Sequence, residues 1–194
     1  MKKIFTTKKI VMAALLAALC YIGFTFCKID IPVGAEKTAF HLGNVFCVLA
    51  ALLLGGFLGG MAGAIGMTIA DLTTGYVTSA PKTFLLKLCI GLIVGFFAQK
   101  VFNLDKSCKR RIPLPIATIL CCSFGMGFNI IADPLVGYFY KMYILGVPQE
   151  VAGIWAKIGA VTTSVNAMIA VIAATIFYLA LRPALKKNNL LPEL

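Results

Sequence analysis

The sequence of 194 residues contains little charge and very little acid. Charged residues make up 13% of it, with seven Asp and Glu against 18 Lys and Arg, and there is one histidine. Hydrophobic residues make up 60%, and the mean hydropathy of +0.95 lies well above that of soluble globular domains. This composition argues against a soluble domain and indicates an integral membrane protein.

The common motifs of nucleotide binding and hydrolysis are missing. The chain has no G-x-x-x-x-G-K-[ST] loop, no G-x-S-x-G and no H-E-x-x-H. The seven cysteines are odd in number and contain no C-x-x-C pair, so they predict packing residues rather than a disulfide framework or a metal cluster. We therefore expect no ATPase site, no enzyme activity and no cofactor.

Long apolar runs dominate the chain instead. A membrane-spanning helix needs roughly 20 apolar residues, and the runs lack the alternation of barrel strands. They predict an all-α bundle of six transmembrane helices, which forms one domain over residues 1–194. The expected helices are 10–26, 42–55, 57–74, 82–101, 114–132 and 159–181, of which the second is short.

Lysine and arginine gather on one side of this topology. They precede the first helix, separate the fourth from the fifth and follow the sixth. By the positive-inside rule this side and both termini are predicted to be cytoplasmic, in a cell membrane. The first run is long for a signal peptide and no A-x-A pattern follows closely, so it is expected to be retained. The bases are Lys2, Lys3, Lys8, Lys9, Lys100, Lys106, Lys109, Arg110, Arg111, Arg182, Lys186 and Lys187.

Polar residues inside the predicted helices all fall toward the outer half of the bundle. Chance would have placed some at the inner ends, so their common depth predicts a binding site open to the outside. Trp155, in the expected outer loop 133–158, can join them. The predicted site residues are His41, Asn44, Asp71, Lys87, Asn129, Asp133, Trp155 and Asn166.

Asp71 and Lys87 are two residues of opposite charge on adjacent predicted helices. Counted from the turn between their helices, both lie on the order of 6 to 9 Å below the outer loop. Ionisable groups at such depth need partners, so the two either pair with each other or bind a ligand. Structural roles are equally open for other members of the set: hydrogen bonds between helices for Asn129 and Asn166, and the interfacial aromatic belt for Trp155.

Two further segments carry predictions. The loop 27–41 is long for a helical connection and is expected to fold over the site. In the first helix, small residues four apart form a face on which another helix can pack closely. This predicted partner interface consists of Ala13, Ala14, Ala17 and Ala18.

The order of these features resembles the S components of energy-coupling factor (ECF) transporters, in particular the riboflavin-type family. The resemblance rests on KKIVMAALLAAL, then HLGNVFCVLAALLLGGFLGGMAGAIGMTIADL, then APKTFLLKLCIGLIVGFFA. It implies a vitamin-binding subunit that captures its substrate at the outer face and works with a membrane T component and two cytoplasmic ATPases. It also implies that the alanine face contacts the T component.

The polar set favours a small planar heterocycle, because polar groups can orient such a ligand while apolar walls exclude water. A B6-type pyridine or a thiamine-precursor pyrimidine fits best, and riboflavin stays a candidate. Two other functions remain open: a self-sufficient carrier or channel, and a membrane scaffold without a ligand.

Overall fold

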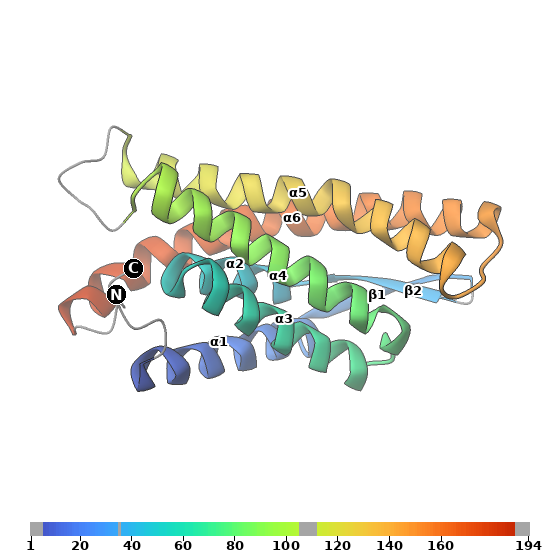
Figure 1. Cartoon of the computed structure of the whole chain (residues 1–194), viewed down its shortest axis with the longest axis horizontal. Helices are drawn as coiled ribbons and strands as arrows, with labels where there is room; N and C mark the ends of the chain where they lie inside the picture. Colours follow the sequence, from blue (N-terminus) through green and yellow to red (C-terminus); the bar gives the residue numbers. More distant parts are fainter. Residues whose placement is uncertain (1–5, 35, 105–111, 189–194) are drawn as a thin grey trace.

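The computed structural model describes residues 6–34, 36–104 and 112–188, which form six α-helices and one β-hairpin (Figure 1). Six of the predicted cytoplasmic bases lie outside these ranges, namely Lys2, Lys3, Lys106, Lys109, Arg110 and Arg111. The elements are α1 Thr7–Thr25, β1 Lys28–Val33, β2 Glu36–His41, α2 Gly43–Leu54, α3 Gly56–Thr73, η1 Val77–Ser79, α4 Ala80–Phe96, η2 Phe97–Val101, α5 Leu114–Tyr143 and α6 Gln149–Lys187.

Five of the helical segments are long and apolar enough to cross a membrane. The exception is α2, which has 12 residues, nearly all of them buried. A helix that is hydrophobic on all sides belongs in the interior of a bundle, and α2 contacts α1, α3, α4 and α6. The prediction of an all-α, multi-pass membrane bundle with a short second helix is confirmed.

Small residues set the close approach of the helices. Gly59 lies against the backbone of Ala50 and Ala51 in α2, while Gly60 of α3 faces Gly91 of α4. A side chain at any of these glycines would separate the helices, so the glycines permit the tight packing that drives association in lipid.

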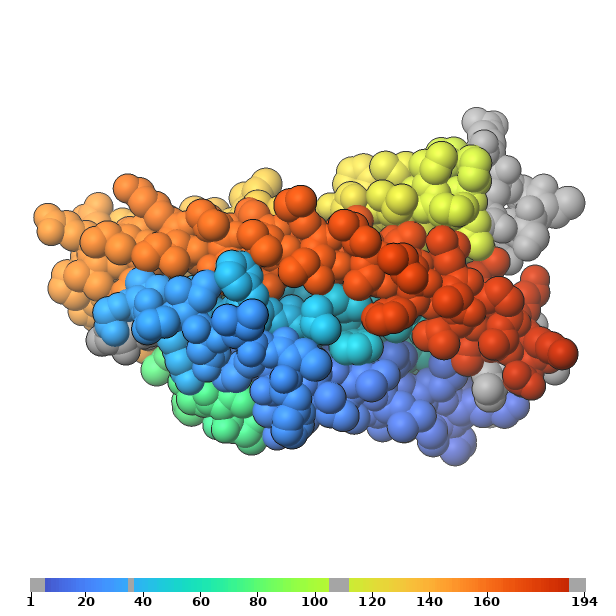
Figure 2. All heavy atoms as spheres, turned by 180° about the vertical axis from the view of Figure 1, so that it is seen from behind, coloured from blue at the N-terminus to red at the C-terminus, as the bar shows by residue number. Residues whose placement is uncertain are grey.

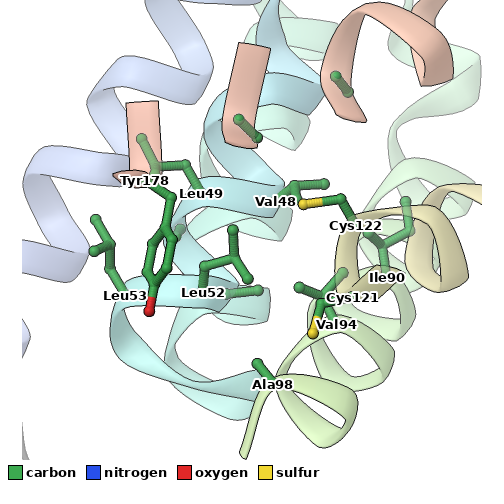
Figure 3. Close-up of a cluster of buried hydrophobic side chains, with 14 of the residues drawn as sticks. Val48, Leu49, Leu52, Leu53, Ile90, Val94, Ala98, Cys121, Cys122 and Tyr178 are labelled. Atoms are coloured by element: carbon green, nitrogen blue, oxygen red, sulfur yellow. The ribbon is translucent and has the colours of Figure 1, made fainter. Parts of the chain in front are cut away.

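A cluster of buried apolar side chains lies between the helices of the bundle. The buried apolar cluster in Figure 3 joins side chains of α2, α4, α5 and α6, among them Leu49, Val94, Cys121 and Tyr178. The start of α1 and the end of α6 lie together at one end of the molecule, and the β-hairpin lies at the other (Figure 1). Buried polar side chains, among them Asn44, Asp71, Asn129 and Asn166, line a cavity together with residues of the hairpin.

The segment 27–41 is an antiparallel hairpin rather than a loop. Lys28 pairs with His41 and Val33 with Glu36, and the turn contains Gly34 with a φ of 63°. Alternating Ile29, Ile31 and Val33 before a glycine is a strand and turn signal. Seen from behind, the hairpin lies between α1 and the first half of α6 (Figure 2).

The prediction of an outer loop over residues 133–158 is wrong. Helix α5 continues through Pro134 to Tyr143, and α6 already begins at Gln149. Proline removes one hydrogen-bond donor and kinks a helix, but neighbouring helices allow it inside membrane bundles. As a result, Asp133 and Trp155 lie on helices and not in a loop.

The predicted alanine face is divided by the structure. Ala14 and Ala18 are exposed, whereas Ala13 and Ala17 are partly buried and pack against the core. The carbonyl oxygen of Ala17 faces Gly66 of α3. Only the first two residues thus offer an open surface, and their contact with a partner stays a prediction.

Candidate functional site

A cavity of about 150 Å³ lies beneath the hairpin, at the ends of α3, α4, α5 and α6. Each of the eight predicted site residues lines it, and so do residues of the hairpin itself. Its further lining includes Phe24, Lys37, Met67, Tyr76, Lys82, Thr83, Lys141, Thr162 and Thr163. The polar groups that the sequence placed at one depth are therefore brought together in one space.

Lys82 and Asp133, two charged residues that line the cavity, neutralise each other's charge. The Lys82 ammonium lies 2.8 Å from Asp133 Oδ1, and the Thr163 hydroxyl donates to Asp133 Oδ2 at 2.7 Å. Both charged side chains are mostly buried, at 15% and 22% exposure. Asp133 is thus satisfied by protein partners, and its main role here is to join α4, α5 and α6.

Other polar atoms of the cavity lining have no partner within the described residues. Among the described residues, no hydrogen-bond partner is present for buried acceptor atoms on three side chains: Asn44 Oδ1, Asp71 Oδ2 and Asn129 Oδ1. His41 Nδ1 also has no hydrogen-bond partner among the described residues. Native proteins rarely leave buried polar atoms unpaired, since each costs about 1–3 kcal/mol. Such a group of atoms lining a cavity is suited to bind a polar ligand.

Lys87 is another buried charged residue of the cavity, at 7% exposure. Within the described ranges its ammonium makes no ion pair and no hydrogen bond, although Asp71 lines the same cavity at 3% exposure. The direct ion pair between Asp71 and Lys87, one of the two alternatives left open by the sequence, is therefore not formed in this structure.

Asn166 and Trp155 hold the hairpin in place. Asn166 accepts a hydrogen bond from the backbone N–H of His41 at 3.0 Å and donates to the carbonyl of Ala39 at 2.9 Å. The Trp155 indole donates to the carbonyl of Val33 at 3.1 Å. Asn166 thus links a helix to a hairpin rather than two helices, and both residues also line the cavity.

A second set of contacts ties the hairpin to the connection between α3 and α4. Tyr76 donates to Asp30 at 2.8 Å, Lys28 and Lys37 lie 3.1 and 3.8 Å from the same carboxylate, and Lys37 donates to the Thr74 carbonyl at 2.9 Å. Partial burial raises the pKa of Asp30, but the hydrogen bond from Tyr76 and the charges of Lys28 and Lys37 outweigh it and leave that pKa below its usual value.

His41 stays neutral at physiological pH. Burial lowers its pKa first, the charge of Lys87 lowers it further, Asp133 opposes them, and the resulting pKa is about 3. The ring also packs on Phe24, with centroids 4.5 Å apart. His41 therefore offers a neutral nitrogen to the cavity.

Several lining residues were not predicted from the sequence. Lys82 directly follows Pro81 at the start of α4, where a base can reach a carboxylate on the next helix, and this position was its only signal. Lys37 and Tyr76 lay in segments read as loops. In the described part of the chain, no group of three or more His, Cys, Asp or Glu side chains is placed to hold a metal.

The two bonds of Asn166 give a first prediction. Asn166→Ala should increase hydrogen exchange at the His41 amide by about tenfold, because that N–H loses its acceptor and β2 loses its tie to α6. Asn188→Ala, at the exposed end of α6, is the control. Unchanged exchange at His41 would show that the hairpin is held by other contacts.

Comparison with known proteins supports the same fold. The family described as "ECF-type riboflavin transporter, S component" matches residues 4–183. A solved structure, the S component for biotin from an ECF-type ABC transporter, superposes with a TM-score of 0.60 at 18% identity. This likeness covers 89% of this chain and 94% of that one.

A curated protein also matches. An uncharacterized protein of Pyrococcus woesei is 35% identical over 75 residues, which are 39% of this chain and 50% of that protein. The match thus spans half of its relative, whereas the family match covers nearly the whole chain. The family match and the six-helix membrane bundle together show that this chain belongs to the S-component family of ECF-type riboflavin transporters. Members of this family are substrate-binding transporter subunits and not enzymes.

Proposed function

We propose that the chain captures a vitamin or a related small heterocycle in the cavity beneath the hairpin and delivers it for ATP-driven uptake. The candidates are a B6-type pyridine, a thiamine-precursor pyrimidine and riboflavin. The observation that carries the proposal is the group of unpartnered buried polar atoms on Asn44, Asp71 and Asn129 around one cavity. Polar groups that orient a ligand between apolar walls are typical of small-molecule sites.

The charge distribution supports an outward-facing cavity. Lys8 and Lys9 lie at the start of α1, Lys100 lies in η2, which follows α4, and Lys186 and Lys187 end α6. These ends lie opposite the hairpin (Figure 1). By the positive-inside rule we place them and both termini in the cytoplasm of a cell whose plasma membrane the bundle spans, so the cavity faces the exterior.

S components of ECF transporters work with a T component and ATPases. We propose that this chain does the same with two cytoplasmic ATPases, because its own sequence has no phosphate-binding loop. The exposed Ala14 and Ala18 of α1 offer a surface for close helix packing with the T component. Ala13 and Ala17 flank that surface from within the bundle.

Two measurements test the proposal. Mass spectrometry of the protein purified in mild detergent should identify a small heterocycle in it. Vesicles that hold the protein alone should bind this compound without sustained accumulation, and addition of the T component and ATPases should start uptake. Accumulation by the protein alone would instead indicate a carrier or channel. If no ligand is found and the cavity variants alter only folding, the chain is a membrane scaffold.

A further inference from the structure

The chemistry of the substrate can be narrowed from the charges of the cavity, if the proposed function holds. Four lysines and two aspartates line it. Lys82 is engaged by Asp133, Lys37 by the Thr74 carbonyl and Asp30, and Lys141 lies over the Trp155 ring at 4.2 Å. Among the described lining residues, Lys87 and Asp71 are the charged groups that form no ion pair, and Asp71 Oδ2 also has no hydrogen-bond partner.

These two groups are of opposite charge and share a small space, yet they do not meet. No ion pair joins Asp71 to Lys87, although both side chains line the same cavity. Asn44 and Asn129, at 3% and 1% exposure, add two more acceptor oxygens to the same space. An ammonium can donate three hydrogen bonds and a carboxylate can accept several. These groups therefore suit a ligand that accepts a hydrogen bond from Lys87 and donates hydrogen bonds to the oxygens of Asp71, Asn44 and Asn129.

The size of the cavity limits that molecule further. A cavity of about 150 Å³ in another protein holds one benzene molecule, and the value here is similar. A single ring fits such a space, whereas a three-ring flavin would require the cavity to enlarge. Apolar side chains, including Phe24, Met67 and Pro134, line the remaining walls and can pack against the faces of a ring.

We propose that Asp71 and Lys87 hold the substrate between them, and that this substrate is a single-ring nitrogen heterocycle with a hydrogen-bond donor beside an acceptor. Amino- or hydroxy-substituted pyrimidines and pyridines have this pattern. The donor binds Asp71 and the amide oxygens, and the ring nitrogen or oxygen accepts from Lys87. A ligand with only a carboxylate would suit Lys87 but would also lie close to the Asp71 carboxylate, which repels it.

The test uses full-length protein in lipid nanodiscs. Trp155 is the only tryptophan of the chain and lines the cavity, so its fluorescence reports binding without a label. The probes are the hydroxymethyl aminopyrimidine precursor of thiamine, pyridoxine, nicotinate, biotin and riboflavin. The variants are Asp71→Asn and Lys87→Met, alone and combined. Glu150→Gln and Lys100→Met make the same changes outside the cavity lining and serve as controls.

We expect the aminopyrimidine or pyridoxine to bind best, and each single variant to weaken that binding by about 10- to 100-fold, since hydrogen bonds to charged groups are being lost. The double variant should raise the thermal stability of the empty protein, because it removes two unsatisfied buried charges. A purely structural role predicts the opposite change in stability and no selective loss of binding.

Other outcomes overturn the inference in distinguishable ways. Tight binding of riboflavin or biotin that is unaffected by Asp71→Asn and Lys87→Met would overturn it and leave the proposed function standing. The same conclusion follows if no probe binds but another vitamin co-purifies with the protein. If no probe binds and nothing co-purifies, both the inference and the proposed function are wrong.

Discussion

Replacing Lys82 by methionine is expected to lower the free energy of unfolding by about 3 kcal/mol, because it leaves the mostly buried Asp133 carboxylate without its cation. The hydrogen bond from Thr163 remains, but one hydroxyl does not neutralise a charge. For a chain of this length the loss corresponds to a fall of about 6–12 °C in the unfolding temperature. Thermal unfolding in detergent measures it directly.

Two further variants make this result specific. Lys82→Met with Asp133→Asn should recover much of the loss, because the double variant buries no uncompensated charge and an amide oxygen can still accept from Thr163. Lys157→Met, on an exposed position of α6, should change stability by less than about 0.5 kcal/mol. A double variant as unstable as Lys82→Met alone would contradict this account of the ion pair.

Gly91→Ala is the second large effect, expected to lower the free energy of unfolding by about 2 kcal/mol. A Cβ at Gly91 would lie 2.6 Å from the backbone nitrogen of Gly60 and closer still to its Cα, so α3 and α4 must separate. Such overpacking costs about 3 kcal/mol. The higher helix propensity of alanine returns about 1 kcal/mol of this.

Gly127→Ala is the matched control, since nothing lies within 4 Å of a Cβ at that position of α5. There the propensity gain acts alone, and the free energy of unfolding should rise by up to about 1 kcal/mol. The two identical substitutions are thus expected to have opposite signs in one thermal unfolding series. Equal effects at both sites would mean that the contact between α3 and α4 does not limit stability.

Much of the fold could be predicted from apolar runs because membrane helices must satisfy their own backbone groups. Depth could be predicted too: Asp71 and Lys87 were counted from the turn at Gly75 and Pro81, and both line the cavity. Contacts between side chains could not be predicted from the sequence. Depth says nothing of rotation about a helix axis, so it did not distinguish an ion pair of Asp71 and Lys87 from two separate charges.

The errors come from segments where the local signals conflict. The fifth helix was predicted to end at 132, just before Pro134, yet α5 packs against α4 and α6 and stays helical to Tyr143. In the hairpin, Lys28 and Asp30 alternate with apolar residues as in a strand, but Pro32 within the run argues against one. That the eight side chains bind a substrate stays a prediction, although they share one cavity.

The hairpin contacts around Asp30 and the buried groups beneath them will respond differently to dissolved ions. Asp30 is 38% exposed, so mobile ions weaken its attraction to Lys28 and Lys37. The side chains of Lys82, Asp133 and Lys87 are less exposed, so dissolved ions screen their charges less. Concentrated electrolyte should therefore weaken the ion pairs that hold the cover of the cavity more than it changes the electrostatic field inside the cavity.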